Sequence, residues 1–308
     1  MYKKIMVPLD GSSAAETALP WTIYLANAFQ AGIVLFHAIE KNPPEQIHGD
    51  AHLANMEEAS AYLESIKNSL HNVFHFKGDI STHVHLEETT DVAASIAMHM
   101  KELRPDLVVM CSHGRSNFTQ AFIGSLATKV IGLGEVPVFL VKSHESEKST
   151  GTDAVGPSIS NVVVALDNAS IHDKAIRYAE EFVQETGARL VLFSAVPRFG
   201  SLKGKDGGWG LMAPATSSAL LDIEEEKMRQ HLDEHQKSLA ARGVSSSNAV
   251  VRGDPARKIA QETKKLEPCL IVLGTHGRSG MGAFWKGSVA AKVVSLTDSP
   301  ILLVPLHE

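Results

Sequence analysis

The chain has 308 residues, which is enough for about two domains of ordinary size. Its hydrophobic content of 44%, charged content of 21% and net charge of −6 are typical of a soluble globular protein and argue against nucleic acid as a main partner. No apolar run reaches membrane-spanning length, and residues 1–4 lead directly into a strand pattern, so we expect neither a membrane segment nor a signal peptide. Cys111 and Cys269 accompany buried strand patterns, which favours free thiols and a cytoplasmic location.

The first half of the chain alternates strand patterns with helix patterns. Strands are predicted at residues 4–9, 33–39, 81–86, 107–111 and 138–141, and helices at residues 13–30, 53–70, 91–103 and 125–133. Ser12 or Ser13 is the expected N-cap of the first helix and Asp91 that of the third, and residues 40–55 read as a polar loop. This alternation predicts an α/β fold in which right-handed crossovers cover both faces of a parallel sheet.

The second half of the chain repeats the first. Asp167 lies 157 residues after Asp10, and both follow an apolar strand pattern, whereas Gly287 lies 163 residues after Gly124. Two constant offsets indicate a duplication with one net insertion, which we place at the glycine-rich residues 199–215 and interpret as a surface loop and not as a lid. The predicted organisation is two domains, residues 1–143 and 159–308, joined by a polar linker at residues 144–158.

A glycine-rich stretch follows the apolar run at residues 270–273. It contains Gly274 and Gly277 and ends, nine residues further on, in Gly287 and Ser288, where a helix pattern opens. Glycines let the backbone turn sharply and approach a ligand, and the N–H groups at a helix start attract anions. The stretch therefore predicts a phosphate site; the alternative is a loop that needs glycine only for its turns.

The spacing Gly-x-x-Gly-x9-Gly-Ser resembles the nucleotide-binding signature of the ATP-binding branch of the universal stress protein family, and each half resembles one domain of that family. The resemblance implies two tandem doubly wound α/β domains, each with a five-stranded parallel sheet of flavodoxin-like type. Such sheets bind ligands outside the carboxyl ends of their strands, where the strand order reverses. The aspartates that end the first strands and the glycine loops that end the fourth strands should therefore line one crevice in each half.

The resemblance also assigns roles in the second half. Backbone groups of the glycines and the hydroxyl of Ser288 would hold phosphate and ribose, Asp167 would lie near the adenine or the ribose, and Arg278 would face the phosphates or solvent. Asp167 could equally cap the first helix of its domain. The expected nucleotide-binding residues are Ala165, Asp167, Ala195, Gly274, Gly277, Arg278, Ser279, Gly287, Ser288 and Val289.

The first half departs from this pattern at two places. Its corresponding residues are Pro8, Asp10, Ala38, Gly114, Arg115, Gly124 and Ser125. Cys111 stands where the signature has its first glycine, and Glu-Thr-Thr-Asp at residues 88–91 stands where the second half has Arg-Gly-Asp-Pro at residues 252–255, which adds negative charge. Both departures make the second half the better candidate for binding.

Histidines recur at spacings that could suit a metal ion, in the pairs His71/His75, His83/His85 and His231/His235. None of these pairs comes with a cysteine or carboxylate at a recognisable spacing, so we expect no metal site. His113 and His276 occupy the same place in both repeats, which favours a structural hydrogen bond over catalysis. No phosphate-loop motif and no catalytic residue is evident; bound ATP would bring Mg²⁺ with it, held mainly by the triphosphate.

The sequence is compatible with three functions. The first is an ATP-binding stress-response sensor that regulates an unidentified protein partner. The second is a slow ATPase or autokinase with Ser279 or Ser288 as acceptor. The third is a nucleotide-free scaffold in which the fifth strands, Val138–Val141 and residues 301–304, pair edge to edge as a built-in dimer. A homodimer through sheet edges is compatible with the first function as well.

Overall fold

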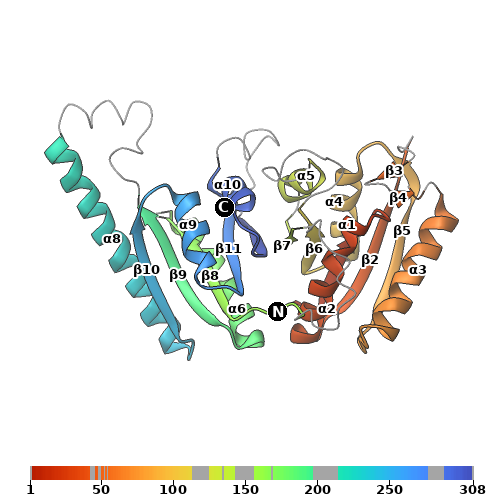
Figure 1. Ribbon diagram of the computed structural model, residues 1–308, viewed down its shortest axis with the longest axis horizontal. Coiled ribbons are helices and arrows are strands. Elements are labelled where there is room, and N and C mark those ends of the chain that lie inside the picture. The colour runs from red at the N-terminus through yellow and green to blue at the C-terminus, as the bar shows by residue number, and fades with distance from the viewer. Residues whose placement is uncertain are drawn as a thin grey trace. The chain divides into compact units, whose positions relative to one another are not determined.

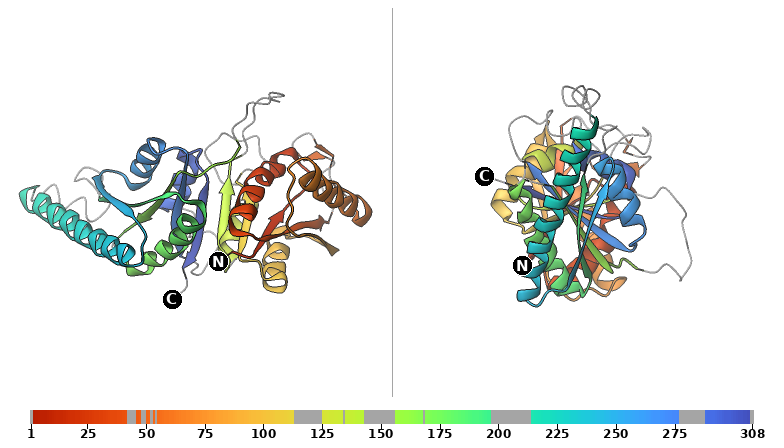
Figure 2. Two further views of the ribbon diagram at one scale, coloured as in Figure 1. Left: turned by 90° about the horizontal axis from the view of Figure 1, so that it is seen from below. Right: turned by 90° about the vertical axis from the view of Figure 1, so that its left-hand side faces the viewer.

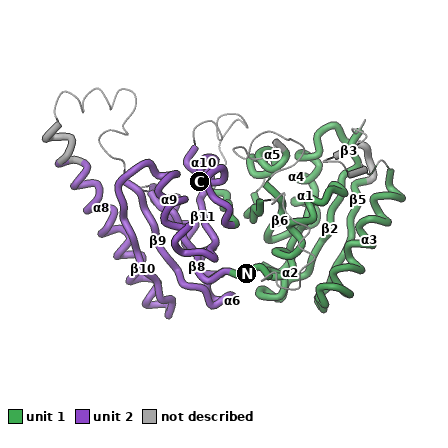
Figure 3. The backbone as a smooth tube through the Cα atoms, viewed as in Figure 1, with its two compact units in different colours: residues 1–158, 276–286, 300–307 green, residues 159–275, 287–299, 308 purple. Residues whose placement is uncertain are grey.

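The computed structural model describes residues 2–41, 46–47, 50–51, 53, 55–112, 125–133, 135–142, 156–167, 169–196, 214–276 and 288–306. The chain divides into two compact units (Figure 3). Unit 1 comprises residues 1–158, 276–286 and 300–307, and unit 2 comprises residues 159–275, 287–299 and 308. Each unit is an α/β structure with a parallel sheet, as the sequence predicts.

Unit 1 follows the predicted alternation of strands and helices (Figure 1). Its elements are β1 (Lys4–Pro8), α1 (Ser13–Glu16), α2 (Ala18–Phe29), β2 (Gly32–Glu40), β3 (Gln46–Ile47), β4 (Asp50–Ala51), α3 (Met56–Asn72), β5 (Ile80–Thr89), α4 (Val92–Leu103), β6 (Leu107–Cys111), α5 (Ser125–Leu133), β7 (Val138–Val141) and β12 (Ile301–Leu306). The parallel strands run in the order β5-β2-β1-β6-β7, and β12 pairs with β7 in the antiparallel sense.

Unit 2 repeats this plan. Its elements are β8 (Asn161–Leu166), the 3₁₀ helix η1 (Ser170–Asp173), α6 (Lys174–Thr186), β9 (Arg189–Val196), α8 (Pro214–Ala241), β10 (Ser246–Arg252), α9 (Pro255–Lys264), β11 (Cys269–His276) and α10 (Val289–Leu296). The strands of the unit run in the order β10-β9-β8-β11, with parallel pairing of β9 to β10, of β8 to β9 and of β8 to β11.

Helices cover both faces of each sheet. In unit 1, α2 and α3 lie on one face and α4 and α5 on the other; in unit 2, α6 and α8 lie opposite α9 and α10 (Figure 2). Successive residues of a strand point to opposite faces, yet Val162, Val163 and Val164 are all at most 1% exposed. This two-sided burial explains why the strands are continuously apolar in the sequence. None of the helices in the described part of the chain combines the length and hydropathy needed to cross a membrane.

The predicted pairing of the two fifth strands is confirmed within unit 1. Leu302 of β12 lies opposite Phe139 of β7, and Ile301 lies opposite Leu140; all four side chains are at most 2% exposed. These two strands therefore satisfy each other's backbone groups inside one chain. A homodimer through sheet edges stays a prediction. The edge of β7 that could have paired with a second chain is already paired with β12.

Several element boundaries differ from the sequence expectation. The first helix is interrupted at Thr17, whose hydroxyl donates to the carbonyl of Ala14 at 2.7 Å, so α1 and α2 are separate. α3 begins at Met56, behind the N-cap Asn55, and β5 continues to Thr89. The short antiparallel ribbon β3–β4 lies in the predicted polar loop. Residues 199–213 of the predicted insertion and residues 144–155 of the linker lie outside the described residues.

Both cysteines are free, as expected. Cys269 is buried at the start of β11, and burial raises the pKa of its thiol, which opposes formation of a reactive thiolate. Cys111 ends β6 and is half-buried.

Gly253, between β10 and α9, has a backbone conformation that a residue with a side chain rarely adopts. Its φ is +154°, and an added Cβ would lie 2.8 Å from Cγ of Lys258. We expect Gly253→Ala to lower the free energy of unfolding by more than about 1 kcal/mol, because the backbone geometry and the close contact both disfavour a side chain. Urea denaturation followed by circular dichroism measures this change. Gly156→Ala is the control, because an added Cβ there meets nothing within 4 Å; an equal loss in both variants would contradict the argument.

Candidate functional site

In unit 2 the strand order reverses between β8 and β11. The chain continues from β8 through β9 to β10 on one side of the sheet and then returns to place β11 on the other side of β8. Ala165 of β8 lies opposite Leu273 of β11, so the carboxyl ends of the two strands are neighbours. Crossover helices lead away from such a point in opposite directions, which is why open α/β sheets bind ligands there. The prediction that the two strands end at one edge is confirmed, and Asp167 directly follows β8 at this edge.

Asp167 directly follows β8 and holds the turn after it. Its Oδ1 accepts the N–H of Ala169 at 2.9 Å and lies 2.5 Å from Nδ1 of His172 in η1. Its side chain is still 60% exposed, so a ligand can reach the carboxylate. Through these two contacts it stabilises the turn that leads into η1.

Asp10 has the equivalent role in unit 1. Its Oδ1 accepts the N–H of Ser12 at 3.0 Å and the hydroxyl of Ser12 at 2.6 Å, and Ser12 in turn caps α1 by accepting the N–H of Ala15 at 3.2 Å. In both repeats the aspartate accepts the N–H two residues further on, which is the local geometry that favours Asp in turns. The predicted cap at Ser12 is confirmed.

Small residues lie at the carboxyl ends of the strands around Asp167. Ala165 near the end of β8, Ala195 near the end of β9 and Gly274 in β11 are all half-buried. β11 continues through Thr275 to His276, three residues beyond the apolar run from which its end was predicted. The expectation that the chain turns at Gly274 is therefore wrong, because Gly274 is a strand residue.

Ser288 is the N-cap of α10, where the glycine-rich stretch ends. Its backbone is extended (φ −65°, ψ 149°), and its Oγ accepts the N–H of Ala291 at 3.2 Å. A hydroxyl that accepts in this way can still donate its hydrogen to a ligand. The N–H groups of the first helical residues, Val289 and Ala290, have no partner inside the helix, and Val289 is 40% exposed. This helix start can therefore receive an anion.

Gly277, Arg278, Ser279 and Gly287 lie outside the described residues, as do Gly114, Arg115 and Gly124 of the first repeat. The same holds for His113 and for the side chain of His276. Their roles stay predictions.

The first repeat places its counterparts in equivalent elements. Pro8 ends β1, Ala38 is buried in β2, Cys111 ends β6 opposite Val141 of β7, and Ser125 begins α5. Since Cys111 falls at the position of Gly274, a strand residue, the backbone accepts a side chain there. At this position the two repeats differ in the side chain alone: the first repeat has a thiol group near the carboxyl end of β6, where the second repeat has none.

At Asp91, the negative charge that was predicted to distinguish the first repeat from the second proves to be common to both. Asp91 is the N-cap of α4 and accepts the N–H of Ala94 at 3.2 Å, just as Asp254, the N-cap of α9, accepts the N–H of Arg257 at 3.0 Å. The two aspartates are 163 residues apart and match each other in the repeats. Asp91 is therefore a shared cap, not an added charge.

Arg252 ties the end of β10 to α8. Its guanidinium pairs with the carboxylates of Asp222 and Glu225. Hydrogen bonds from Arg229 and from Arg252 hold the pKa of Glu225 below its usual value. Arg252 is thus occupied by a structural ion pair.

Four histidines of unit 1 contact each other or the backbone: His71, His83, His85 and His99. His71 Nδ1 lies 2.8 Å from the carbonyl of Phe76. The ring centroid of His99 lies 4.8 Å from those of His83 and His85. Burial is the main cause that lowers the pKa of His83, and the nearby His99 lowers it further.

Sequence reasoning missed two groups near the candidate site of unit 2. One is His172, which contacts Asp167 from five residues away. The other is Asp173, which contacts His231 and His235 of α8. The helical spacing of the two histidines was visible in the sequence, but their carboxylate partner lies 58 residues from His231 and left no local signal.

Comparison with known proteins agrees with this fold and duplication. A family model described as the universal stress protein family matches residues 1–142 and 158–305. Universal stress protein Rv2623 of Mycobacterium tuberculosis is 24% identical over 314 residues, covering 97% of this chain and 95% of that protein. Universal stress protein Sll1654 of Synechocystis sp. is 33% identical over 141 residues, covering 46% of this chain and 86% of that protein.

A solved structure of a universal stress protein from Archaeoglobus fulgidus shares the fold, with a TM-score of 0.67 at 15% identity over 99% of this chain and 97% of that chain. Because the family model matches nearly the whole length in two successive segments, the chain belongs to the universal stress protein family and contains two copies of its domain.

Proposed function

We propose that this protein binds ATP in its second repeat, at the carboxyl ends of β8 and β11, and acts as a sensor or regulator in a stress response. One observation carries the proposal. The reversal of strand order brings the exposed carboxylate of Asp167 to the edge at which β11 runs into the glycine-rich stretch that ends at α10. A nucleotide needs both kinds of group, an acceptor for its ribose or adenine and N–H donors for its phosphates.

The chemistry of these donors suits a nucleotide. The start of α10 offers the N–H groups of Val289 and Ala290, which have no partner inside the helix, and the hydroxyl of Ser288; backbone groups of Gly277 and Gly287 would add further donors. Asp167 would accept from the ribose or adenine. Ala165, Ala195 and Gly274 would leave room for the nucleotide over the strand ends. Mg²⁺ would be held mainly by the triphosphate.

The mode of action that we propose is occupancy without fast chemistry. Bound ATP would order the segment between β11 and α10 and change the surface that a partner protein meets. No catalytic residue is assigned, and Ser288, a candidate phosphoryl acceptor, already uses its Oγ as the cap of α10. We propose residues 1–143 and 159–308 as the two domains, and a cytoplasmic location.

A direct test of the site is titration calorimetry with ATP. We expect Asp167→Ala to weaken binding at least about tenfold, because a hydrogen bond to a charged group contributes about 1.5–3 kcal/mol. His172→Asn removes the contact of Asp167 within η1 but keeps the carboxylate, so most of the affinity should remain. Asp10→Ala changes only the first repeat and should leave the affinity unchanged. Equal binding by wild type and Asp167→Ala, or binding lost in Asp10→Ala alone, would place the nucleotide elsewhere.

The number of nucleotides bound tests the difference between the repeats. Because Cys111 replaces the glycine that Gly274 provides in the second repeat, we expect purified protein to release about one adenine nucleotide per chain on heat denaturation, measured by mass spectrometry. Two nucleotides per chain would show that the thiol is tolerated. No nucleotide, together with no binding in calorimetry, would overturn the proposed function.

A further inference from the structure

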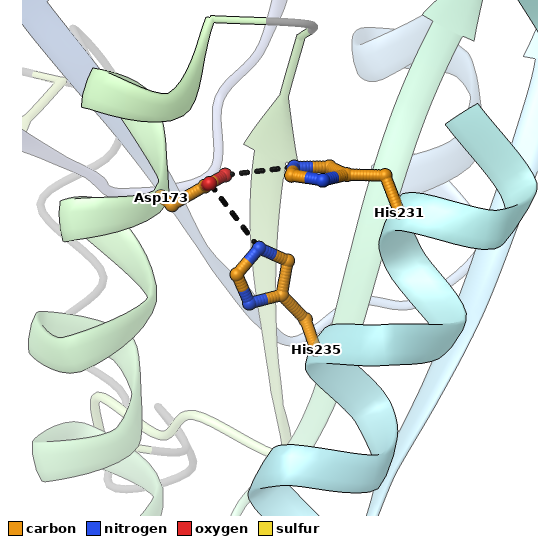
Figure 4. A group of neighbouring side chains, drawn as sticks. All are labelled: Asp173, His231 and His235. Atoms are coloured by element: carbon orange, nitrogen blue, oxygen red, sulfur yellow. Dashed lines mark hydrogen bonds and ion pairs between the residues drawn. The ribbon is translucent and has the colours of Figure 1, made fainter. Parts of the chain in front are cut away.

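We propose that Asp173, His231 and His235 form a binding site for a divalent transition-metal ion, of which Zn²⁺ fits the ligands best. The three side chains converge from two elements of unit 2: Asp173 lies where η1 meets α6, and both histidines project from α8 (Figure 4). None of these three residues belongs to the proposed nucleotide site, and the inference does not depend on that proposal.

The distances match a set of metal ligands. Nε2 of His231 lies 3.0 Å from Oδ1 of Asp173, and Nε2 of His235 lies 3.3 Å from Oδ2 of Asp173. One ligand atom from each residue can be chosen so that all three lie within 4.8 Å of one another. Ligands in a tetrahedral zinc site, with bonds of about 2.0–2.1 Å, are roughly 3.3 Å apart. Small side-chain rotations would therefore place an ion between them.

The elements orient the ligands before any ion arrives. His231 and His235 are one helical turn apart, so their imidazoles share a face of α8. Met228 and Leu232, beside them on α8, are at most 2% exposed and fix that face against the unit. Asp173 is the N-cap of α6, yet its side chain makes no capping hydrogen bond. Aspartate at this position ordinarily caps the helix; here the carboxylate is turned to the two imidazoles instead.

Burial is intermediate at all three residues. The side chains of Asp173, His231 and His235 are 18%, 28% and 26% exposed. An ion can thus enter from solvent and keep water in its remaining positions. Two imidazoles with one carboxylate suit zinc and its neighbours in the first transition row, whereas Mg²⁺ and Ca²⁺ prefer oxygen ligands throughout.

Without an ion, the same three residues would form a hydrogen-bonded bridge, in which each neutral imidazole donates its Nε2–H to one carboxylate oxygen. This bridge would also join η1 and α6 to α8. It predicts a loss of stability on substitution but no response to metal. The two arrangements therefore differ in a measurable way.

The test is zinc binding by the full chain after treatment with a chelator. We expect the wild type to take up one tightly bound Zn²⁺ per chain in titration calorimetry and to show a higher Tm with zinc than with chelator, because an ion that binds only the folded state stabilises it. Asp173→Asn, His231→Asn and His235→Asn should each weaken zinc binding at least about tenfold, since the loss of an outer partner of a ligand alone costs that much.

Two controls separate this site from other histidines. His85→Asn alters the histidine group of β5 and α4, and His75→Asn alters an exposed histidine after α3; both variants should bind zinc like the wild type. Circular dichroism of every variant in chelator confirms that it is folded. Wild-type protein with no uptake of zinc and no change in Tm would overturn the proposal, and so would uptake that survives the three substitutions. Loss of uptake in His85→Asn alone would place the ion at the histidines of β5 and α4.

Discussion

The position of β8 between β9 and β11 is the constraint on which the candidate site depends. Parallel pairing sets the carboxyl ends of all these strands at one edge, and the return of the chain from β10 to β11 separates the crossover helices there. Asp167 and the start of the glycine-rich stretch meet for this reason, although they are more than a hundred residues apart in the sequence. The strand order thus determines where the candidate site lies, and the side chains at that place determine what it can bind.

In each unit, much of the polar chemistry at the carboxyl edge of the sheet already serves the fold. Asp167 and Asp10 hold the backbone after their strands, and Ser288, Asp254 and Asp91 cap the helices that begin nearby. Such caps satisfy N–H groups that a helix start leaves without partners. Among the residues that the structure describes in unit 2, the exposed part of Asp167 and the first N–H groups of α10 are the groups that the proposed nucleotide would use.

Sequence patterns predict the strands well because buried parallel strands are continuously apolar, and the constant offsets between repeats reveal the duplication. They fail where the deciding contact is distant or side-chain specific. Gly274, Thr275 and His276 lack a strand pattern, yet β11 includes them. The pair His231/His235 looked incomplete because its carboxylate, Asp173, lies on an element that only the fold brings near. The remaining residues of the glycine-rich stretch, 277–287, lie outside the described residues, so their prediction rests on spacing alone.

The attachment of α8 to α6 shows how polar contacts can specify an arrangement that apolar packing permits. Leu221, Met228, Leu232 and Leu239 form the buried stripe of α8, which holds the helix against the unit. Just after α8, Arg242 pairs through two nitrogens with the two carboxylate oxygens of Glu180 on α6, each at 2.9 Å. Nearer the middle of α8, His231 and His235 meet Asp173 at the start of α6. Because two polar contacts far apart along one helix fix both its rotation and its sliding, the imidazoles are held where a metal ion could use them without a large rearrangement.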